Sequence, residues 1–117
     1  MKPWFGAGVA LVSLCGAAAA QSASYPQRPI TIVVTAAPGG VTDVTARALG
    51  QGLTQAWGQP VVVENKGGGA HIVGAEAVAK AAPDGYTLMV AEAGTFTINP
   101  VIYPPAKLPY DTNTAFV

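Results

Sequence analysis

Three short segments contain the residues whose types and spacing could bind a ligand. Residues 37–43 and 67–71 are rich in glycine and run into predicted helices, and a third segment spans residues 92–97. Glycine lets a backbone approach a ligand closely, and a helix N-terminus carries unpaired N–H groups with a partial positive charge. Two such ends at one edge would bind an anion, most simply a carboxylate or a phosphate. The candidate ligand-binding residues are Pro38, Gly39, Gly40, Thr42, Asp43, Gly68, Gly69, Ala70, His71, Gly94 and Thr95.

The same glycines could instead serve only as tight turns between strands and helices. For two glycine-rich loops at one edge, we favour ligand binding. Neither loop has a nucleotide signature, since G-x-x-x-x-G-K-[ST] is absent from the sequence. Gly50-Gln51-Gly52 is followed by Gln55 where the third glycine of G-x-G-x-x-G would stand.

Residues for acid–base or metal chemistry are few. His71 is the only histidine, and a lone loop histidine is most simply a solvated polar residue, without partners at metal-ligand spacing. Asp43, Glu64 and Glu92 could face one cleft as paired acids, but we favour Asp43 as a helix cap and the two glutamates as rim residues. We therefore predict no catalytic residue, no metal site and no cofactor.

The elements that must position these loops alternate along the chain. Apolar, β-branched runs predict strands at 30–35, 60–65 and 86–91, and helical spacing predicts helices at 41–57 and 72–82. This order predicts an α/β fold with a parallel β-α-β-α-β sheet and right-handed crossovers. In such a sheet the ligand lies outside the carboxyl ends of the strands, where all three segments lie.

The spacing within the first helix also predicts which side chains it buries. The apolar residues expected on its buried face are Val41, Val44, Ala48, Leu49, Leu53 and Trp57. Gly50 and Gly52 weaken this helix and could mark close packing against a neighbour.

Composition excludes several classes of protein. The chain has 117 residues, of which 50% are hydrophobic and 10% charged, and its formal net charge is zero. A nucleic-acid partner is not expected, because no basic stripe could neutralise phosphates. A disordered chain would be more polar and more strongly charged. The length suggests one small domain, and the single cysteine excludes a disulfide framework.

The first twenty residues have the layout of a secretory signal. Lys2 precedes an uncharged apolar run, and Ala18-Ala19-Ala20 offers small residues for cleavage before Gln21. The alternatives are an uncleaved membrane anchor and a lipid-anchored N-terminus at Cys15. We expect a signal peptide at 1–20, an extended lead-in at 21–29 and an α/β lobe at 30–117, in an exported protein.

Several motifs in order resemble the Bug receptors, the TctC-like periplasmic solute receptors of tripartite tricarboxylate transporters. The resemblance extends from Tyr25 to about Val117. Its motifs are Tyr25-Pro26-Gln27-Arg28-Pro29-Ile30, Pro38-Gly39-Gly40 with Thr42-Asp43 and Ala46-Arg47, Gly58-Gln59-Pro60-Val61-Val62-Val63-Glu64-Asn65, Gly74-Ala75-Glu76, Ala82-Pro83-Asp84-Gly85-Tyr86-Thr87-Leu88, Ile98-Asn99-Pro100 and Leu108-Pro109-Tyr110-Asp111.

The resemblance implies a periplasmic-binding fold of two α/β lobes with a cleft between them. Family members bind small organic acids, amino acids or related compounds, pass them to a membrane permease and catalyse no reaction. We expect a monomer whose two glycine-rich loops touch a small carboxylate from lobe one. Family members are about three times longer, so this chain is expected to form an incomplete N-terminal lobe. Where they carry an Asn shortly before the position of Gly74, this chain has His71-Ile72, and His71 is a candidate replacement.

Two other functions compete with a receptor. An α/β enzyme with an anionic cofactor would need a nucleophile or an acid–base pair, which the sequence does not clearly supply. A stand-alone interaction module would fold without any ligand.

Overall fold

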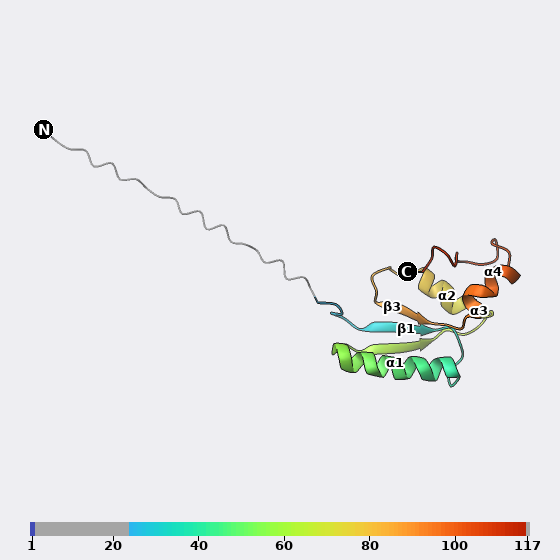
Figure 1. Ribbon diagram of the computed structural model, residues 1–117, viewed down its shortest axis with the longest axis horizontal. Helices are drawn as coiled ribbons and strands as arrows, with labels where there is room; N and C mark the ends of the chain where they lie inside the picture. The colour runs from blue at the N-terminus through green and yellow to red at the C-terminus, as the bar shows by residue number, and fades with distance from the viewer. Residues whose placement is uncertain (2–23, 117) are drawn as a thin grey trace.

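The computed structural model of the chain describes Met1 and residues 24–116 (Figure 1). The predicted signal peptide beyond Met1 and the start of the lead-in lie outside these described residues. In the part of the chain that is described, no helix has the length and apolar character needed to span a membrane.

The centre of the fold is a three-stranded parallel sheet. Its strands are β1 (Ile30–Val34), β2 (Val61–Asn65) and β3 (Thr87–Val90), in the spatial order β2-β1-β3. In the register, Ile32 of β1 lies opposite Val63 on one side and Leu88 on the other. The predicted parallel β-α-β-α-β arrangement is confirmed, and the carboxyl ends of all three strands meet at one edge.

Helices cover both faces of this sheet (Figure 1). Helix α1 (Val41–Trp57) packs against β1 and β2, whereas α2 (Ile72–Ala79) packs against β1 and β3 on the opposite face. The segment after β3 contains two short helices, α3 (Gly94–Thr97) and α4 (Asn99–Ile102), because backbone N–H groups there bond back three or four residues.

Strand β1 forms the core. Ile30, Ile32 and Val34 are fully buried, as expected for a central strand covered by helices on both faces. Edge strand β2 alternates instead: Val61 and Val63 are half-buried, whereas Val62 is exposed. The apolar run in β2 therefore did not reveal that one of its faces is open.

The predicted buried face of α1 is largely wrong. Apart from Leu53, which packs against the core, the residues expected on that face are exposed; they are Val41, Val44, Ala48, Leu49 and Trp57. The buried residues are Asp43, Ala46 and Gly50. Gly50 lets the helix lie close to β2, since a Cβ there would be 3.4 Å from Val61 Cγ1. The small residues and the polar contacts of Asp43 thus set the rotation of α1.

The described part of the lead-in is fixed at the end of the sheet opposite the loops. The Tyr25 ring makes edge contacts with Tyr86 (5.1 Å between centroids) and Trp57 (5.9 Å). Arg28 lies over the Tyr86 ring and pairs with Asp84 at 2.7 Å. These contacts join the lead-in to the start of β3 and the end of α1.

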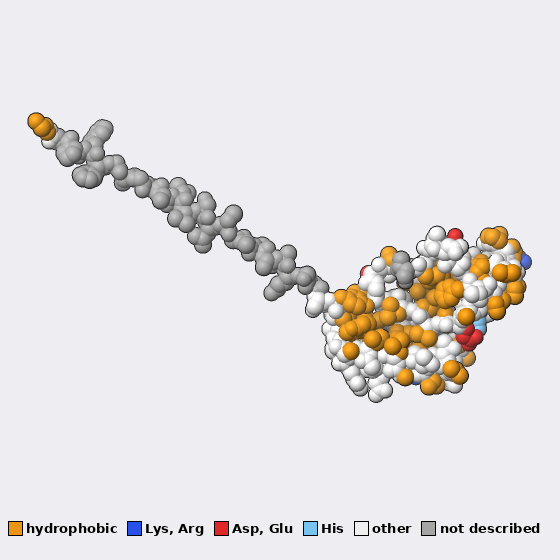
Figure 2. All heavy atoms as spheres, viewed as in Figure 1, with side chains coloured by type: hydrophobic (Ala, Val, Ile, Leu, Met, Phe, Trp, Pro, Cys, Tyr) orange, Lys and Arg blue, Asp and Glu red, His pale blue; other side chains and the backbone are white. Residues whose placement is uncertain are grey.

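The outer edge of β3 has no strand beside it among the described residues. Next to it lies an apolar groove of about 440 Å³. The groove is lined by Ile32, Leu49, Val78, Ala81, Ala82, Pro83, Gly85, Thr87, Leu88, Met89, Val90, Phe96, Ala115 and Phe116. Figure 2 shows apolar side chains spread over much of the visible face of the domain.

Candidate ligand-binding site

Loop one, residues 35–40, connects β1 to α1. Its turn depends on Gly39, whose φ of +86° lies in the left-handed region that favours glycine. Gly40 is the N-cap with extended backbone, and its carbonyl accepts the first helical hydrogen bond from the Val44 N–H at 3.0 Å. The N–H groups of residues 41–43 therefore have no carbonyl partner within the helix and point toward the loop end of the sheet.

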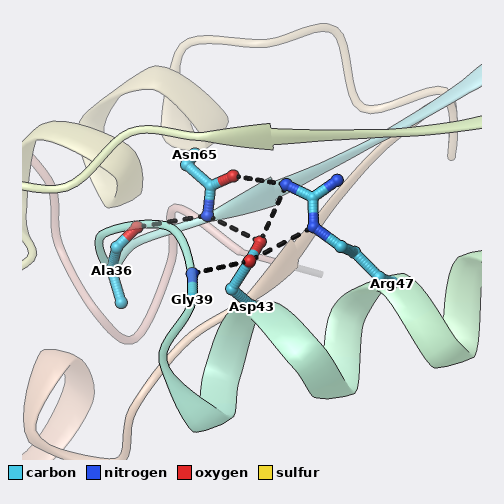
Figure 3. Close-up of polar contacts among 5 residues, drawn as sticks. All are labelled: Ala36, Gly39, Asp43, Arg47 and Asn65. Atoms are coloured by element: carbon cyan, nitrogen blue, oxygen red, sulfur yellow. Dashed lines mark hydrogen bonds and ion pairs between the residues drawn. The ribbon is translucent and has the colours of Figure 1, made fainter.

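A polar network around the buried Asp43 carboxylate fixes loop one (Figure 3). The Asp43 carboxylate accepts hydrogen bonds from the Gly39 N–H at 2.8 Å and from Asn65 Nδ2 at 2.9 Å. Arg47 donates to the same carboxylate from Nε at 3.2 Å and to Asn65 Oδ1 from Nη2 at 3.0 Å. Asn65 Nδ2 also contacts the Ala36 carbonyl at 3.4 Å. The network joins the start of α1, the end of β2 and the middle of loop one.

These donors favour the charged form of Asp43. The hydrogen bond from the Gly39 N–H, followed by those from Arg47 and Asn65, lowers the pKa of Asp43 from 3.8 to about 2. The side chain was predicted to contact a ligand, but its carboxylate is buried and engaged with these donors. Asp43 thus supports loop one, and its contact with a ligand stays a prediction.

Loop two, residues 66–71, connects β2 to α2 through an uncommon backbone. Gly68, Gly69, Ala70 and His71 all have positive φ, with values of 121°, 53°, 55° and 69°. Ala70 and His71 carry a Cβ, which makes the left-handed region unfavourable for them. Asn99 Nδ2 donates to the Ala70 carbonyl at 2.8 Å, and this contact from α4 helps to hold the loop.

Replacing Ala70 with glycine should stabilise the protein. Glycine adopts this positive φ without the Cβ penalty, so we expect a gain of about 1 kcal/mol in the free energy of unfolding. Urea unfolding of the full-length protein measures it. As a matched control, Ala48→Gly on the exposed face of α1 should cost about 1 kcal/mol, because that position is right-handed helix. If the two substitutions changed the free energy of unfolding equally, backbone strain at Ala70 would be contradicted.

The two loops are in direct backbone contact and enclose a hollow. A Cβ at Gly67 would lie 3.1 Å from both Ala36 C and Ala37 N, so only glycine lets the loops approach this closely. The hollow has a volume of about 410 Å³. It is lined by Thr35, Ala36, Ala37, Pro38, Gly67, Gly68, Ala70 and His71. The structure thus brings the first two predicted loops together at one site.

Some predicted site residues line this hollow and others do not. The candidates in the lining are Pro38, Gly68, Ala70 and His71. Gly39, Gly40 and Thr42 belong to the turn and the first residues of α1, and Gly69 lies within loop two. Gly94 and Thr95 are instead part of α3, where Gly94 packs against Ile98 and Thr95 is fully buried. Contact of any of these residues with a ligand stays a prediction.

Several residues that line the hollow were not among the candidate ligand-binding residues. Thr35 and Ala36 lie outside the predicted segments, and Ala37 and Gly67 lie inside them without being candidate residues, yet all four line the hollow. Thr35 had a detectable signal, because it is a polar residue at the end of a mostly apolar predicted strand. No sequence signal marks Ala36 and Ala37, because they shape the hollow only through their backbone.

Glu92, in the segment after β3, joins the first turn of α1 to loop two. The Thr42 hydroxyl donates to Glu92 Oε1 at 3.4 Å, and His71 Nε2 lies 3.5 Å from Glu92 Oε2. His71 Nδ1 lies 2.8 Å from the Thr35 carbonyl oxygen, which only accepts, so this nitrogen carries the proton. His71 was expected to be solvated, but it connects loop two to the end of β1 and to Glu92.

The chemistry available at the hollow is hydrogen bonding from the backbone. Among the described residues, no group of three or more His, Cys, Asp or Glu side chains could hold a metal ion. The loops that lead into α1 and α2 meet there, and the N-cap of α2, His71, lies in the lining, an arrangement that suits an anion.

The sequence was also compared with known protein families. Residues 45–116, more than half of the chain, match the model of the tripartite tricarboxylate transporter family receptor, TctC. The chain belongs to this receptor family. The resemblance seen in the motifs is therefore confirmed.

Relatives of the receptor family agree in sequence and in fold. A UPF0065 protein of Bordetella pertussis is 41% identical over 101 residues, which cover 86% of this chain and 31% of that protein. Among solved structures, periplasmic binding protein BugD has a TM-score of 0.68 at 38% identity, over 78% of this chain and 29% of BugD. The fold is thus that of the periplasmic binding proteins.

Two further similar structures were solved with acids. MatC from Rhodopseudomonas palustris, with bound malate, has a TM-score of 0.71 at 38% identity, over 78% of this chain and 30% of MatC. R. palustris Rpa4515, with adipate, has a TM-score of 0.72 at 34% identity, over 78% of this chain and 30% of that protein. The chain spans less than a third of the length of each of these relatives.

Proposed function

We propose that this chain supplies loop one and loop two to a periplasmic solute receptor that captures a small organic acid. The hollow between the loops would hold a carboxylate of the ligand, and no reaction would follow. The observation that carries this proposal is that the two loops leading into α1 and α2 line one hollow, with the N-cap of α2 in its lining.

The charge distribution supports backbone donors as the anchor. The lining of the hollow, as far as the structure describes it, contains no Lys or Arg. Arg47 is engaged by Asp43 and Asn65, and Lys66 lies 3.4 Å from Glu64. Backbone N–H groups keep their direction without a flexible side chain, so they can bind a carboxylate with little loss of conformational entropy.

The biological setting is part of the same proposal. The receptor would be exported by cleavage after Ala20 and would work in the periplasm as a monomer. It would hand its ligand to the membrane permease subunits of a tripartite tricarboxylate transporter. Membership of the family supports this setting, as do the malate and adipate bound by MatC and Rpa4515.

The full-length protein should distinguish acids from their neutral amides. Charge-assisted hydrogen bonds contribute roughly 1.5–3 kcal/mol each, so a bound acid should exceed its amide in affinity by about tenfold or more. The measurement is calorimetric titration with propionate, succinate and β-alanine, and with the amide of each. Equal affinities for every acid and its amide would refute carboxylate binding.

A paired substitution localises the binding to the hollow. Ala37 is exposed and lines the hollow, so Ala37→Leu should fill part of it and weaken acid binding. Ala56→Leu makes the same change on the exposed last turn of α1, at the other end of the sheet, and should leave affinity unchanged. Unchanged affinity in Ala37→Leu would place the site elsewhere.

A further inference from the structure

Asn99 is a buried polar residue to which the proposed function gives no role. It begins α4 within the motif Ile98-Asn99-Pro100, and only 5% of its surface is exposed. Its Nδ2 donates a hydrogen bond to the Ala70 carbonyl oxygen at 2.8 Å. Because Ala70 is exposed and lines the hollow, this hydrogen bond connects α4 to the part of loop two that lies at the candidate site.

The two short helices that carry Asn99 are themselves held in place. The Tyr103 N–H donates to the Asn99 carbonyl at 2.9 Å, which closes the turn of α4. The buried Tyr110 hydroxyl donates to the Thr95 carbonyl on α3 at 3.3 Å. The Asn99 amide therefore reaches loop two from a fixed support, which makes its hydrogen bond more precise than a contact from a free loop.

The hydrogen bond at the Ala70 carbonyl also orients the N–H of His71, because both groups belong to one planar peptide. This peptide is trans, so its C=O and N–H point in opposite directions. The carbonyl is directed at Asn99, and the N–H is therefore directed away from Asn99. Within the described part of the chain this N–H donates to no acceptor. It remains available to a ligand at the hollow, which Ala70 and His71 both line.

The backbone of loop two has a reason to turn if it is not held. Ala70 and His71 have φ values of 55° and 69°, in the left-handed region that is unfavourable for residues with a Cβ. Rotation of the peptide between them would let the backbone leave this region and would redirect the His71 N–H. The Asn99 amide opposes this rotation because it fixes the direction of the Ala70 carbonyl.

We propose that Asn99 is a positioning residue for ligand binding, which keeps the His71 N–H directed at the carboxylate of the bound acid. This inference rests on the proposed function, because it assumes that a carboxylate binds at the hollow. It concerns the backbone N–H of His71 and is independent of the charge of the imidazole ring. A loop that samples other conformations binds with an affinity reduced by the fraction that is competent, so loss of the tether should weaken binding.

Asn99→Ala in the full-length protein should lower the affinity for an acid about tenfold and that for its amide about threefold. The acid loses more, because a carboxylate gains more from an N–H donor than a neutral carbonyl does. Calorimetric titration with propionate, succinate and β-alanine, and with the amide of each, measures both affinities. A collapsed hollow would weaken acid and amide equally, so their affinity ratio separates positioning from a merely structural effect. Asn113→Ala makes the same change at an exposed asparagine and should leave both affinities unchanged.

Ala70→Gly should restore part of the lost affinity. Glycine adopts a positive φ without the Cβ penalty, so this substitution in the Asn99→Ala background should recover about threefold in acid affinity. Gly52→Ala in the same background is the control for stability. It lies on α1, where a Cβ meets nothing within 4 Å, and should stabilise the fold without recovering affinity.

The wild-type protein offers a measurement that does not depend on the folding of any variant. In its NMR spectrum the His71 amide proton should move downfield as the acid is added, as expected for an N–H that donates to a carboxylate. An unmoved His71 resonance, an unchanged acid affinity in Asn99→Ala, equal losses for acid and amide, or equal recovery with Gly52→Ala would each overturn the role of Asn99. The proposed function would stand in those cases if the wild-type protein still bound acids better than amides. Equal binding of acids and amides by the wild-type protein, or no binding of any acid, would refute both.

Discussion

Replacing Gly74 with alanine is expected to destabilise the fold by about 3 kcal/mol, because the added methyl group has no space. A Cβ at Gly74 would lie 2.8 Å from the Lys66 carbonyl oxygen, 2.9 Å from Thr35 Cγ2 and 3.0 Å from Thr35 Cα. Two of these atoms belong to the backbone, so a side-chain rotation cannot relieve the clash. Helix α2 would have to move away from β1 and loop two.

Urea unfolding of the full-length protein measures this effect, and Gly52→Ala is the matched control. Gly52 also lies in a helix, but a Cβ there would meet nothing within 4 Å. The control should stabilise the protein by about 1 kcal/mol, since alanine is the better helix former. The opposite signs of these two changes in the free energy of unfolding would separate the effect of packing from that of helix propensity. A neutral Gly74→Ala variant would show that α2 does not pack as closely as described.

Acid is expected to weaken the fold through Asp43. The pKa of this carboxyl is lowered from 3.8 to about 2 in the folded protein, so the folded state favours its ionised form. The stabilisation it provides is fully present above pH 3.8 and is lost as the pH falls through about 2. Unfolding by urea at a series of pH values between 6 and 2 should show this loss.

Asp43→Asn should be less stable than the wild-type protein at neutral pH and should lose less stability in acid. An amide has one acceptor oxygen where the carboxylate has two, so its NH₂ group would face donors from Gly39, Arg47 or Asn65. Asp111→Asn is the control, because Asp111 is exposed and accepts only the Asn113 N–H among the described side-chain contacts. If the pH dependence of Asp43→Asn matched that of the wild-type protein, the network would not be its source.

The sequence by itself determined the order of the elements and the edge at which the loops meet. Apolar β-branched runs such as Ile30–Val34 alternate with helical spacing, and that alternation permits few topologies besides a parallel sheet. The carboxyl ends of parallel strands share one edge, so chain order alone places residues 37–43 and 67–71 together. These inferences succeed because they depend on local periodicity and chain direction.

The tertiary structure alone decided the roles of individual side chains. The rotation of α1 could not be predicted from its apolar stripe, because it depends on how closely Gly50 approaches β2 and on the polar partners of Asp43. Asn65 meets Asp43 across 22 positions of sequence, and Asn99 reaches the Ala70 carbonyl across 29. Contacts between such distant residues are fixed by packing of the whole fold, and a local sequence pattern does not predict them.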